Sequence, residues 1–436
     1  GNSKFNKENG DSNINANNTH KNAVFIEIFD SIVNGKFMTN AVFIYKLRVM
    51  SFITLNSCLV HLLNFVSVID RNDKGNYQVV SLFKQCIQLI KLISSGNIKE
   101  KSNSNILLEL SLDLLRKLTS TLGSTLMLNC KKEISEFYIE GDCVLNKKEF
   151  LPVWKLIIKD IGLSYPDLID ELLARINIGS IFSKTSDKEK IKYLRLLLLI
   201  IYSGENNAFC DKLGNILEKL KEIMHLFNDS LDLEAELFLM IRVLFIKFSS
   251  DSLLDVLKHI WPSIFSKLVT VFKKSAESLS VLQKSTFDLS VSAIKLIECL
   301  TIINSEDFCL YEWVFIPDGF NILGKEISEP LVPIHYSFEG NFFNPLLLTL
   351  ISDLNSLEPY FNEAKQAMNH SKNSTEKYLN LSYQAFNINH NDKNSLASEL
   401  DKLTKRVIYK ICVMNNFNIE INWANLHNSI ENDLFN

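Results

Sequence analysis

The chain has 436 residues, of which 47% are hydrophobic and 22% charged, and its formal net charge is −4. This charge argues against a nucleic-acid-binding protein, which needs a basic surface to displace counterions from phosphates. The length suits two or three domains or one elongated repeat array. With only 14 Gly and 8 Pro, the composition favours long helices joined by short loops.

The first 22 residues are polar and rich in asparagine, and we expect a disordered linker there. From residue 23 to 368, apolar residues recur at three- and four-residue spacing between polar turns, which predicts one α-helical repeat region. The predicted helices before residue 316 span 23–34, 38–69, 77–95, 104–122, 125–139, 147–161, 166–176, 188–203, 206–227, 230–248, 250–275, 279–304 and 306–315.

Two apolar runs within these helices bear on membrane insertion. Val49–Ile69 contains no Asp, Glu, Lys or Arg, but its apolar and polar residues fall largely on different faces. This favours a buried amphipathic helix over a transmembrane one. Tyr193–Tyr202 is too short to cross a bilayer.

The helical pattern changes after residue 318. Proline and glycine break it between Gly319 and Asn344, which predicts a loop laid over the helices. We expect a helix at 345–367, a flexible polar loop at 369–395, and a C-terminal amphipathic helix and tail at 396–436. The amphipathic helix should dock on the array or on a partner through Leu396, Leu400, Leu403, Val407, Ile408 and Ile411.

Consecutive helices that each bury one face, without a fixed-length repeat, predict an all-α fold. The expected architecture is a degenerate HEAT- or armadillo-like helical-repeat solenoid with a C-terminal helix. A compact helical bundle is the alternative. An alternating β pattern is absent apart from the short segment Val314–Pro317.

The chain carries no motif of a known enzyme class: GxGxxG, P-loop, HExxH, GxSxG and kinase signatures are all missing. The eight histidines show no metal-ligand spacing with each other or with cysteine. We therefore predict no enzymatic activity, no cofactor and no metal. The eight cysteines lack CxxC spacing and are predicted to be reduced core thiols of a cytosolic protein.

One basic cluster is a candidate contact with anionic lipid headgroups or with a protein partner. Asp187 and Glu189 dilute its charge, and a solvated helix face is the alternative interpretation. The cluster consists of Lys184, Lys188, Lys190, Lys192 and Arg195.

Two sequence blocks, Leu237–Phe272 and Ala293–Phe320, carry a family resemblance. In this order they are similar to the C-terminal region of the Dopey family, whose members are very large cytosolic proteins of Golgi and endosome traffic. The resemblance extends over roughly residues 170–415. The positions that match family motifs are Arg242, Val243, Trp261, Pro262, Val269–Phe272, Trp313, Phe315, Ile316 and Pro317.

The matching aromatic residues have a structural interpretation. We expect Trp261 and Pro262 at a corner between two helices, where proline sets the entry angle and tryptophan buries a large area. Trp313, Phe315 and Ile316, before Pro317, should anchor an extended strip against the last helix pair. A core or corner role is favoured over a peptide-binding site.

The resemblance implies a non-enzymatic scaffold or adaptor module in endosome-to-Golgi and Golgi vesicle transport. The implied partners are a Sec7-related Arf-regulator scaffold and an aminophospholipid flippase, with kinesin light chain as a further candidate. The implied location is cytosolic and peripheral on Golgi, trans-Golgi network and endosomal membranes, reached through protein partners. The alternative function is a generic HEAT-like protein-binding module of an unrelated pathway, such as nuclear transport, and an uncharacterised helical enzyme comes third.

Overall fold

The computed structural model describes residues 54, 73–94, 101–121, 129–141, 143–145, 147–176, 186–226, 230–303, 306–316, 336–338, 341–343, 345–353, 357, 393–417 and 423–435. The chain divides into two compact units, residues 1–133 and 134–436. Two predicted segments, 1–22 and 23–34, lie outside the described residues, as does 38–69 apart from Thr54. The predicted polar loop 369–395 also lies outside them, except that its last three residues begin a helix.

Unit 1 contains α3 (Asp73–Ser94) and α4 (Lys101–Thr121), which pack against each other. The apolar residues at helical spacing are buried in both, as the sequence pattern predicts. Phe83 and Ile90 of α3 and Leu112 and Leu115 of α4 are fully buried. Cys86 donates a hydrogen bond from its thiol to the Ser111 carbonyl at 3.3 Å.

Unit 2 begins within a set of short turns. The helix α6 (Lys131–Ser135) crosses the boundary between the units and continues as a π-helical turn, η1 (Glu136–Glu140). After a 3₁₀ turn, η2 (Lys148–Phe150), the long helices start.

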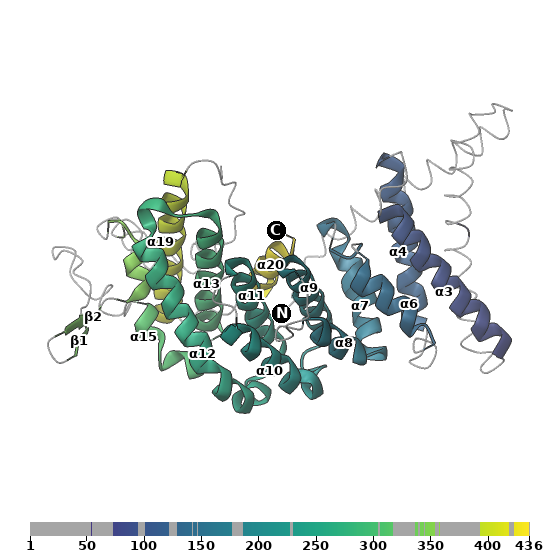
Figure 1. Cartoon of the computed structure of the whole chain (residues 1–436), viewed down its shortest axis with the longest axis horizontal. Helices are drawn as coiled ribbons and strands as arrows, with labels where there is room; N and C mark the ends of the chain where they lie inside the picture. The colour runs from purple at the N-terminus through teal and green to yellow at the C-terminus, as the bar shows by residue number, and fades with distance from the viewer. Residues whose placement is uncertain are drawn as a thin grey trace, which may run out of the picture. The chain divides into compact units, whose positions relative to one another are not determined.

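The long helices of unit 2 alternate between two layers. In the first layer each helix packs against the next, in the order α7 (Leu151–Ser164), α9 (Asp187–Ser203), α11 (Leu231–Lys247) and α13 (Lys284–Ile302) (Figure 1). The second layer contains α8 (Asp167–Arg175), α10 (Cys210–Leu226) and α12 (Ser250–Glu277), again each against the next. The layers join where α8 meets α9 and where α12 meets α13.

The sequence explains which helices lie innermost. Helix α11 is buried almost continuously from Leu233 to Ile246, and α9 from Leu196 to Ser203. A helix that is apolar on nearly all sides must be covered on all sides, so these two occupy the middle of the first layer. Helix α9 begins at a capping box, in which Ser186 and Glu189 bond to each other's backbone amides.

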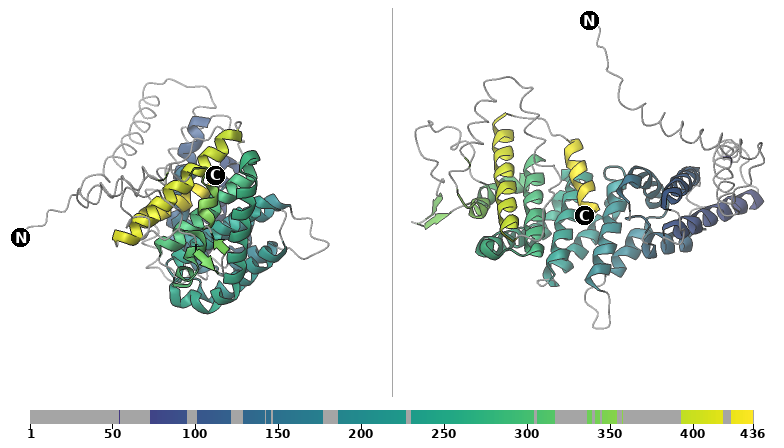
Figure 2. Two further views of the ribbon diagram at one scale, coloured as in Figure 1. Left: turned by 90° about the vertical axis from the view of Figure 1, so that its left-hand side faces the viewer. Right: turned by 90° about the horizontal axis from the view of Figure 1, so that it is seen from above.

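The C-terminal helices return to the first layer. Helix α19 (Lys393–Phe417) packs against α13, and its predicted apolar face from Leu396 to Ile411 is buried, which confirms docking on the array. Helix α20 (Trp423–Leu434) packs against α11, where the sequence pattern predicted only a tail. In Figure 2 both helices lie on the same side of the stacked helices.

Several predicted boundaries are wrong. The predicted helix 279–304 is a 3₁₀ turn, η3 (Leu279–Val281), followed by α13, and 306–315 is two short helices, α14 (Glu306–Cys309) and α15 (Glu312–Phe315). The predicted helix 345–367 begins as a 3₁₀ turn, η4 (Leu346–Leu350). Four of its five residues are leucines buried against α12 and α19, so tertiary packing and not amphipathic spacing sets its form.

A small hairpin stands where the sequence predicted only a loop. Strands β1 (Tyr336–Phe338) and β2 (Asn341–Phe343) pair antiparallel, with Tyr336 opposite Phe343 and Phe338 opposite Asn341. Aromatic residues at both strands favour such pairing, a signal that Gly340 and the flanking prolines masked. Val314 and Phe315, in the segment with a weak β pattern, are helical instead.

The all-α prediction is confirmed, with helices stacked side by side in two layers as in a solenoid. Helices of the first layer begin at Leu151, Asp187, Leu231 and Lys284, at unequal intervals. A HEAT or armadillo repeat therefore stays a prediction. Among the helices that the structure describes, none is long and apolar enough to cross a membrane.

Candidate functional site

The motif residues Arg242 and Val243 lie in the middle of α11, and both are buried, at 2% and 0% exposure. A buried guanidinium needs a carboxylate or other acceptors, because an unpaired charge is costly away from water. Arg242 donates from Nη1 to Asp433 Oδ2 at 2.6 Å and from Nη2 to Ser429 Oγ at 2.6 Å. Both acceptors belong to α20.

Asp433 joins α20 to two helices at once. Its Oδ1 accepts a hydrogen bond from Lys295 Nζ on α13, in addition to the bond from Arg242 on α11. Burial by itself would raise the pKa of Asp433, but the charges of Lys295 and Arg242 outweigh it and lower the pKa below its ordinary value. The carboxyl group is therefore ionised at neutral pH.

A second ion pair lies beside the first. Arg195 on α9 donates from Nε to Glu236 Oε1 at 2.9 Å, and its Nη1 is 3.5 Å from the carbonyl oxygen of Leu434 on α20. Burial raises the pKa of Glu236, an effect that the neighbouring Arg195 opposes. Arg195 thus links α9, α11 and the end of α20.

A third polar group joins α20 to α7 and α9. The Tyr202 hydroxyl is 3.0 Å from His427 Nδ1 and donates to Glu431 Oε1 at 3.1 Å. Lys155 Nζ reaches the same carboxylate oxygen at 3.1 Å and lies 4.6 Å from the centre of the Tyr202 ring. Burial and the charges of Lys155 and Lys247 lower the pKa of His427.

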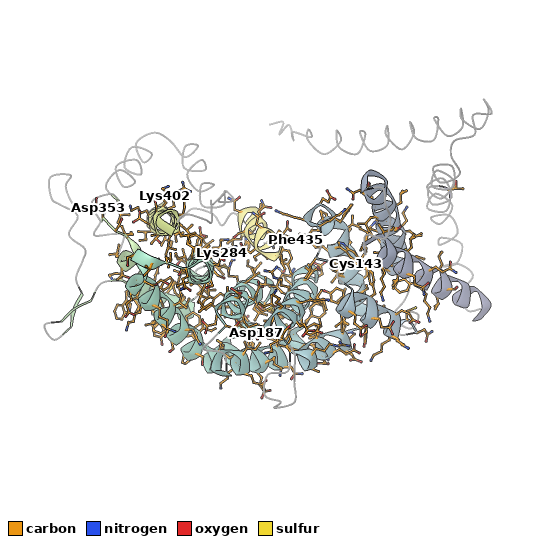
Figure 3. The ribbon with its side chains drawn as sticks, turned by 45° about the horizontal axis from the view of Figure 1, so that its top comes forward. Cys143, Asp187, Lys284, Asp353, Lys402 and Phe435 are labelled. Atoms are coloured by element: carbon orange, nitrogen blue, oxygen red, sulfur yellow. The ribbon has the colours of Figure 1, made fainter. Side chains whose placement is uncertain are left out.

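We call the surface formed by Lys155, Arg195, Tyr202, Arg242 and Lys295 the α20 seat. It carries four cationic side chains, with Glu236 as a buried acidic neighbour, whereas α20 supplies Glu431 and Asp433 and contains no Lys or Arg. The apolar face of α20 is buried through Leu426, Ile430 and Leu434. Figure 3 shows Phe435 just beyond this helix and above Asp187, which begins α9.

The second motif pair, Trp261 and Pro262, lies inside α12 and not at a corner. The helix is continuous from Ser250 to Glu277, so the predicted corner is wrong. Proline removes one helical hydrogen bond, but a helix can continue when packing on both sides of the proline fixes it. The predicted burial of Trp261 is confirmed at 6% exposure.

Trp261 belongs to a cluster of aromatic rings. Its ring centre lies 6.4 Å from that of Phe245 and 6.3 Å from that of Phe308, both in edge-to-face geometry. Phe315 packs in the same cluster against Phe308 and Phe272. We call the rings of Phe245, Trp261, Phe265, Phe272, Phe308 and Phe315 the aromatic cluster.

Trp313 does not share this environment. Phe315 and Ile316 are buried as predicted, but Trp313 is 47% exposed, so its predicted burial is wrong. Helical neighbours two positions apart face different directions, so a short helix that buries Phe315 turns Trp313 outward. The exposed apolar residues Leu310, Tyr311 and Trp313 form what we call the Trp313 surface; Pro317 lies outside the described residues.

The basic cluster of α9 is partly turned inward. Lys190 is 8% exposed and pairs with Asp187 at 3.1 Å, Lys192 donates to the Glu140 carbonyl at 3.3 Å, and Arg195 belongs to the α20 seat. Lys188 is exposed. Lys184 lies outside the described residues, and contact of the cluster with lipid stays a prediction.

The described residues hold no group of three or more His, Cys, Asp or Glu side chains that could bind a metal. Of the cysteines with described side chains, Cys86, Cys130, Cys143 and Cys299 are buried as predicted. Cys210 and Cys309 are exposed, contrary to the prediction. Burial raises the pKa of Cys86 to about 12, so its thiol stays protonated and unreactive at neutral pH.

Sequence reasoning missed the α20 side of the seat: Ser429, Glu431 and Asp433. The signal was present as apolar residues at four-residue spacing, Leu426, Ile430 and Leu434, with acidic residues between them. Asparagine-rich surroundings hid that signal, because asparagine is common in loops.

Comparison with known proteins agrees with the resemblance of the two blocks. A family model described as DOP1 C-terminal matches residues 16–334. A protein named "Protein dop1" from Emericella nidulans is 22% identical over 192 residues, which covers 41% of this chain and 10% of that protein. A "Protein DOP1 homolog" from Drosophila pseudoobscura pseudoobscura is 23% identical over 243 residues, 46% of this chain and 9% of that protein.

The chain therefore spans about a tenth of the length of these curated relatives. No solved structure matches it. The family match also takes in the N-terminal helices, which carried no recognised family motif. Because the family model covers well over half of the chain, the chain belongs to the DOP1, or Dopey, family and contains its C-terminal region.

Proposed function

We propose that this chain is a non-enzymatic scaffold module that binds protein partners in endosome-to-Golgi and Golgi vesicle transport. Membership of the DOP1 C-terminal family supports this proposal. So does the architecture, because stacked helices offer long surfaces to partners without a catalytic centre. The candidate partners are a Sec7-related Arf-regulator scaffold and an aminophospholipid flippase, with kinesin light chain as a further candidate.

The Trp313 surface is the observation that carries the proposal. Leu310 is 69% exposed and Trp313 47%, and both belong to the sequence block that resembles the family. Tryptophan and tyrosine are enriched at the energetic centres of protein interfaces. Large apolar side chains gathered at one exposed place are typical of a surface that is covered in an assembly.

We propose that the chain reaches cytosolic faces of Golgi, trans-Golgi network and endosomal membranes through these partners. The net charge of −4 gives no long-range attraction to an anionic leaflet. Lys190 and Arg195, two members of the basic cluster, already have acidic partners within the protein. These charges support the proposal of indirect recruitment.

A capture experiment with matched tryptophan variants tests the proposal. The tagged chain is expressed in cells that contain a DOP1-family protein, and the proteins captured with it are identified by mass spectrometry. We expect recovery of the Sec7-related scaffold or the flippase, and loss of it in Trp313→Ser. Trp423→Ser removes a tryptophan of similar exposure, 45%, from α20 and serves as the control.

Recovery of nuclear-transport cargo in place of these partners would favour the generic HEAT-like module. Equal recovery of partners by the wild-type chain and by Trp313→Ser would show that the Trp313 surface is not part of the interface. Liposome flotation with phosphatidylserine at physiological salt tests recruitment separately. Strong binding by the chain alone, abolished in Lys184→Gln/Lys188→Gln, would contradict the indirect route.

A further inference from the structure

Helix α20 is held by its contacts and not by its own helical stability. It has 12 residues, a length at which an isolated helix is marginal in water. Leu426, Ile430 and Leu434 bury one face of it, while Trp423 at its start is 45% exposed. Helix α20 is therefore expected to be folded only while it is docked.

The charges of the α20 seat select what can dock there. Arg242 and Lys295 both bond to the single carboxylate of Asp433, and Lys155 bonds to Glu431. Without α20, Arg195 would keep Glu236, but Arg242 and Lys295 would lose their shared bonds to the Asp433 carboxylate. The vacant seat would be a cationic surface beside an apolar one, which matches an acidic amphipathic helix.

The recognised pattern is short. It consists of apolar residues at three positions four residues apart, a hydroxyl that meets Arg242, and a carboxylate that meets both Arg242 and Lys295. A helix laid in a groove through such spaced anchors is a common mode of peptide recognition. Any acidic helix with this pattern would satisfy the same donors.

We propose that the α20 seat is a receptor for an acidic amphipathic helix of a protein partner, and that α20 is its internal competitor. The site lies apart from the Trp313 surface, and the inference does not depend on the transport pathway proposed above. Tethering gives α20 a high effective concentration, so the partner helix binds fully only when α20 is displaced. Release of α20 thus controls access to the seat.

The experiment uses the whole chain and a labelled peptide with the sequence of residues 421–436. Fluorescence anisotropy measures peptide binding to the wild-type chain, to Asp433→Lys, whose own helix is repelled from the seat, and to Asn428→Lys. The last variant also introduces a lysine into α20, but at an exposed position. A peptide with Asp433→Lys is the ligand control.

We expect the peptide to bind the Asp433→Lys chain at least about tenfold more tightly than the wild-type or Asn428→Lys chains, because the internal competitor is weakened. The altered peptide should bind none of them. Equal, weak binding to all three chains would overturn the proposal. Equal binding of the original peptide and of the peptide with Asp433→Lys would also overturn it.

A second measurement keeps the test decisive if Asp433→Lys fails to fold. Hydrogen exchange of the wild-type chain is followed with and without excess peptide. The added peptide carries Trp423→Phe, so that its fragments differ in mass from those of the chain's own α20. Faster exchange of the chain's own residues 423–434 on peptide addition would show displacement. Unchanged exchange at saturating peptide would show that α20 is a permanent part of the fold and overturn the proposal.

Discussion

The α20 seat and the aromatic cluster are both built around residues of the family blocks, but they hold the protein together by different forces. At the seat, Arg242 is buried against a carboxylate and a hydroxyl from a helix far away in the sequence. In the cluster, Trp261 packs edge-to-face with Phe245 and Phe308. One contact needs matched charges, whereas the other needs only apolar area and shape.

This difference predicts how each region fails. Loss of a ring from the aromatic cluster leaves a cavity between α11, α12 and the α14–α15 segment, which cannot close without moving whole helices. Loss of a charge at the seat can be relieved by local detachment of α20, because water then hydrates Arg242 and Lys295. The cluster should therefore fail globally and the seat locally.

The largest expected effect is that of Trp261→Ala. Removal of this nearly buried ring should lower the free energy of unfolding of unit 2 by about 3–5 kcal/mol. Urea unfolding followed by far-ultraviolet circular dichroism measures the change. Trp261→Phe, which retains an aromatic ring, should recover part of the loss, and an effect below about 1 kcal/mol for Trp261→Ala would contradict the described packing.

Asp433→Ala should destabilise the docking of α20 by about 3 kcal/mol, because it leaves Arg242 and Lys295 without their shared carboxylate. The loss is expected in hydrogen exchange of residues 423–434, with little change in exchange of α12. Asn428→Ala, at an exposed position of the same helix, is the control. A uniform loss of protection throughout unit 2 would show that the seat does not open locally.

A smaller effect on the docking of α20 is expected from a change in pH. The pKa of His427 is lowered in the folded state by burial, Lys155 and Lys247, with Glu431 acting in the opposite direction. Its contribution to stability is therefore complete above its ordinary pKa of about 6.5 and is lost as the pH falls through the folded pKa. Exchange of α20 should accelerate modestly between pH 7 and pH 5.

His427→Gln should flatten that pH dependence. The pKa of Asp433 is also lowered, so its contribution to stability is lost only in stronger acid. The pKa of Glu236 is raised, so protonation of this group as the pH falls favours the folded state. Exchange rates are compared after correction for the intrinsic effect of pH. An unchanged slope in His427→Gln would assign the pH dependence to another group.

Trp313→Ser should have the smallest effect on stability, within about 0.5 kcal/mol, because the side chain is 47% exposed. Thermal unfolding of Trp313→Ser and Trp261→Ala side by side measures the difference between two tryptophans of one family region. A large loss for Trp313→Ser would mean that its ring supports the fold. Retained stability with lost partner capture would mark it as an interface residue.

Some features followed from the sequence because they depend on local spacing. The apolar stripe from Leu396 to Ile411 predicted a docked helix, and apolar residues at helical spacing predicted a helix at 230–248, close to the bounds of α11. The family motifs could also be recognised from the sequence, because Arg242, Trp261 and Phe315 lie in contiguous blocks. Periodicity is a property of neighbouring residues and needs no knowledge of the distant chain.

Other features were decided only by the tertiary structure. The sequence places Arg242 and Asp433 far apart, and only the return of α20 across the first layer makes them an ion pair. Trp313 and Phe315 look equivalent in sequence, but α15 packs on one face and leaves Trp313 exposed. A buried charge needs a partner and an amphipathic helix needs a surface, but the fold alone determines which residues supply them.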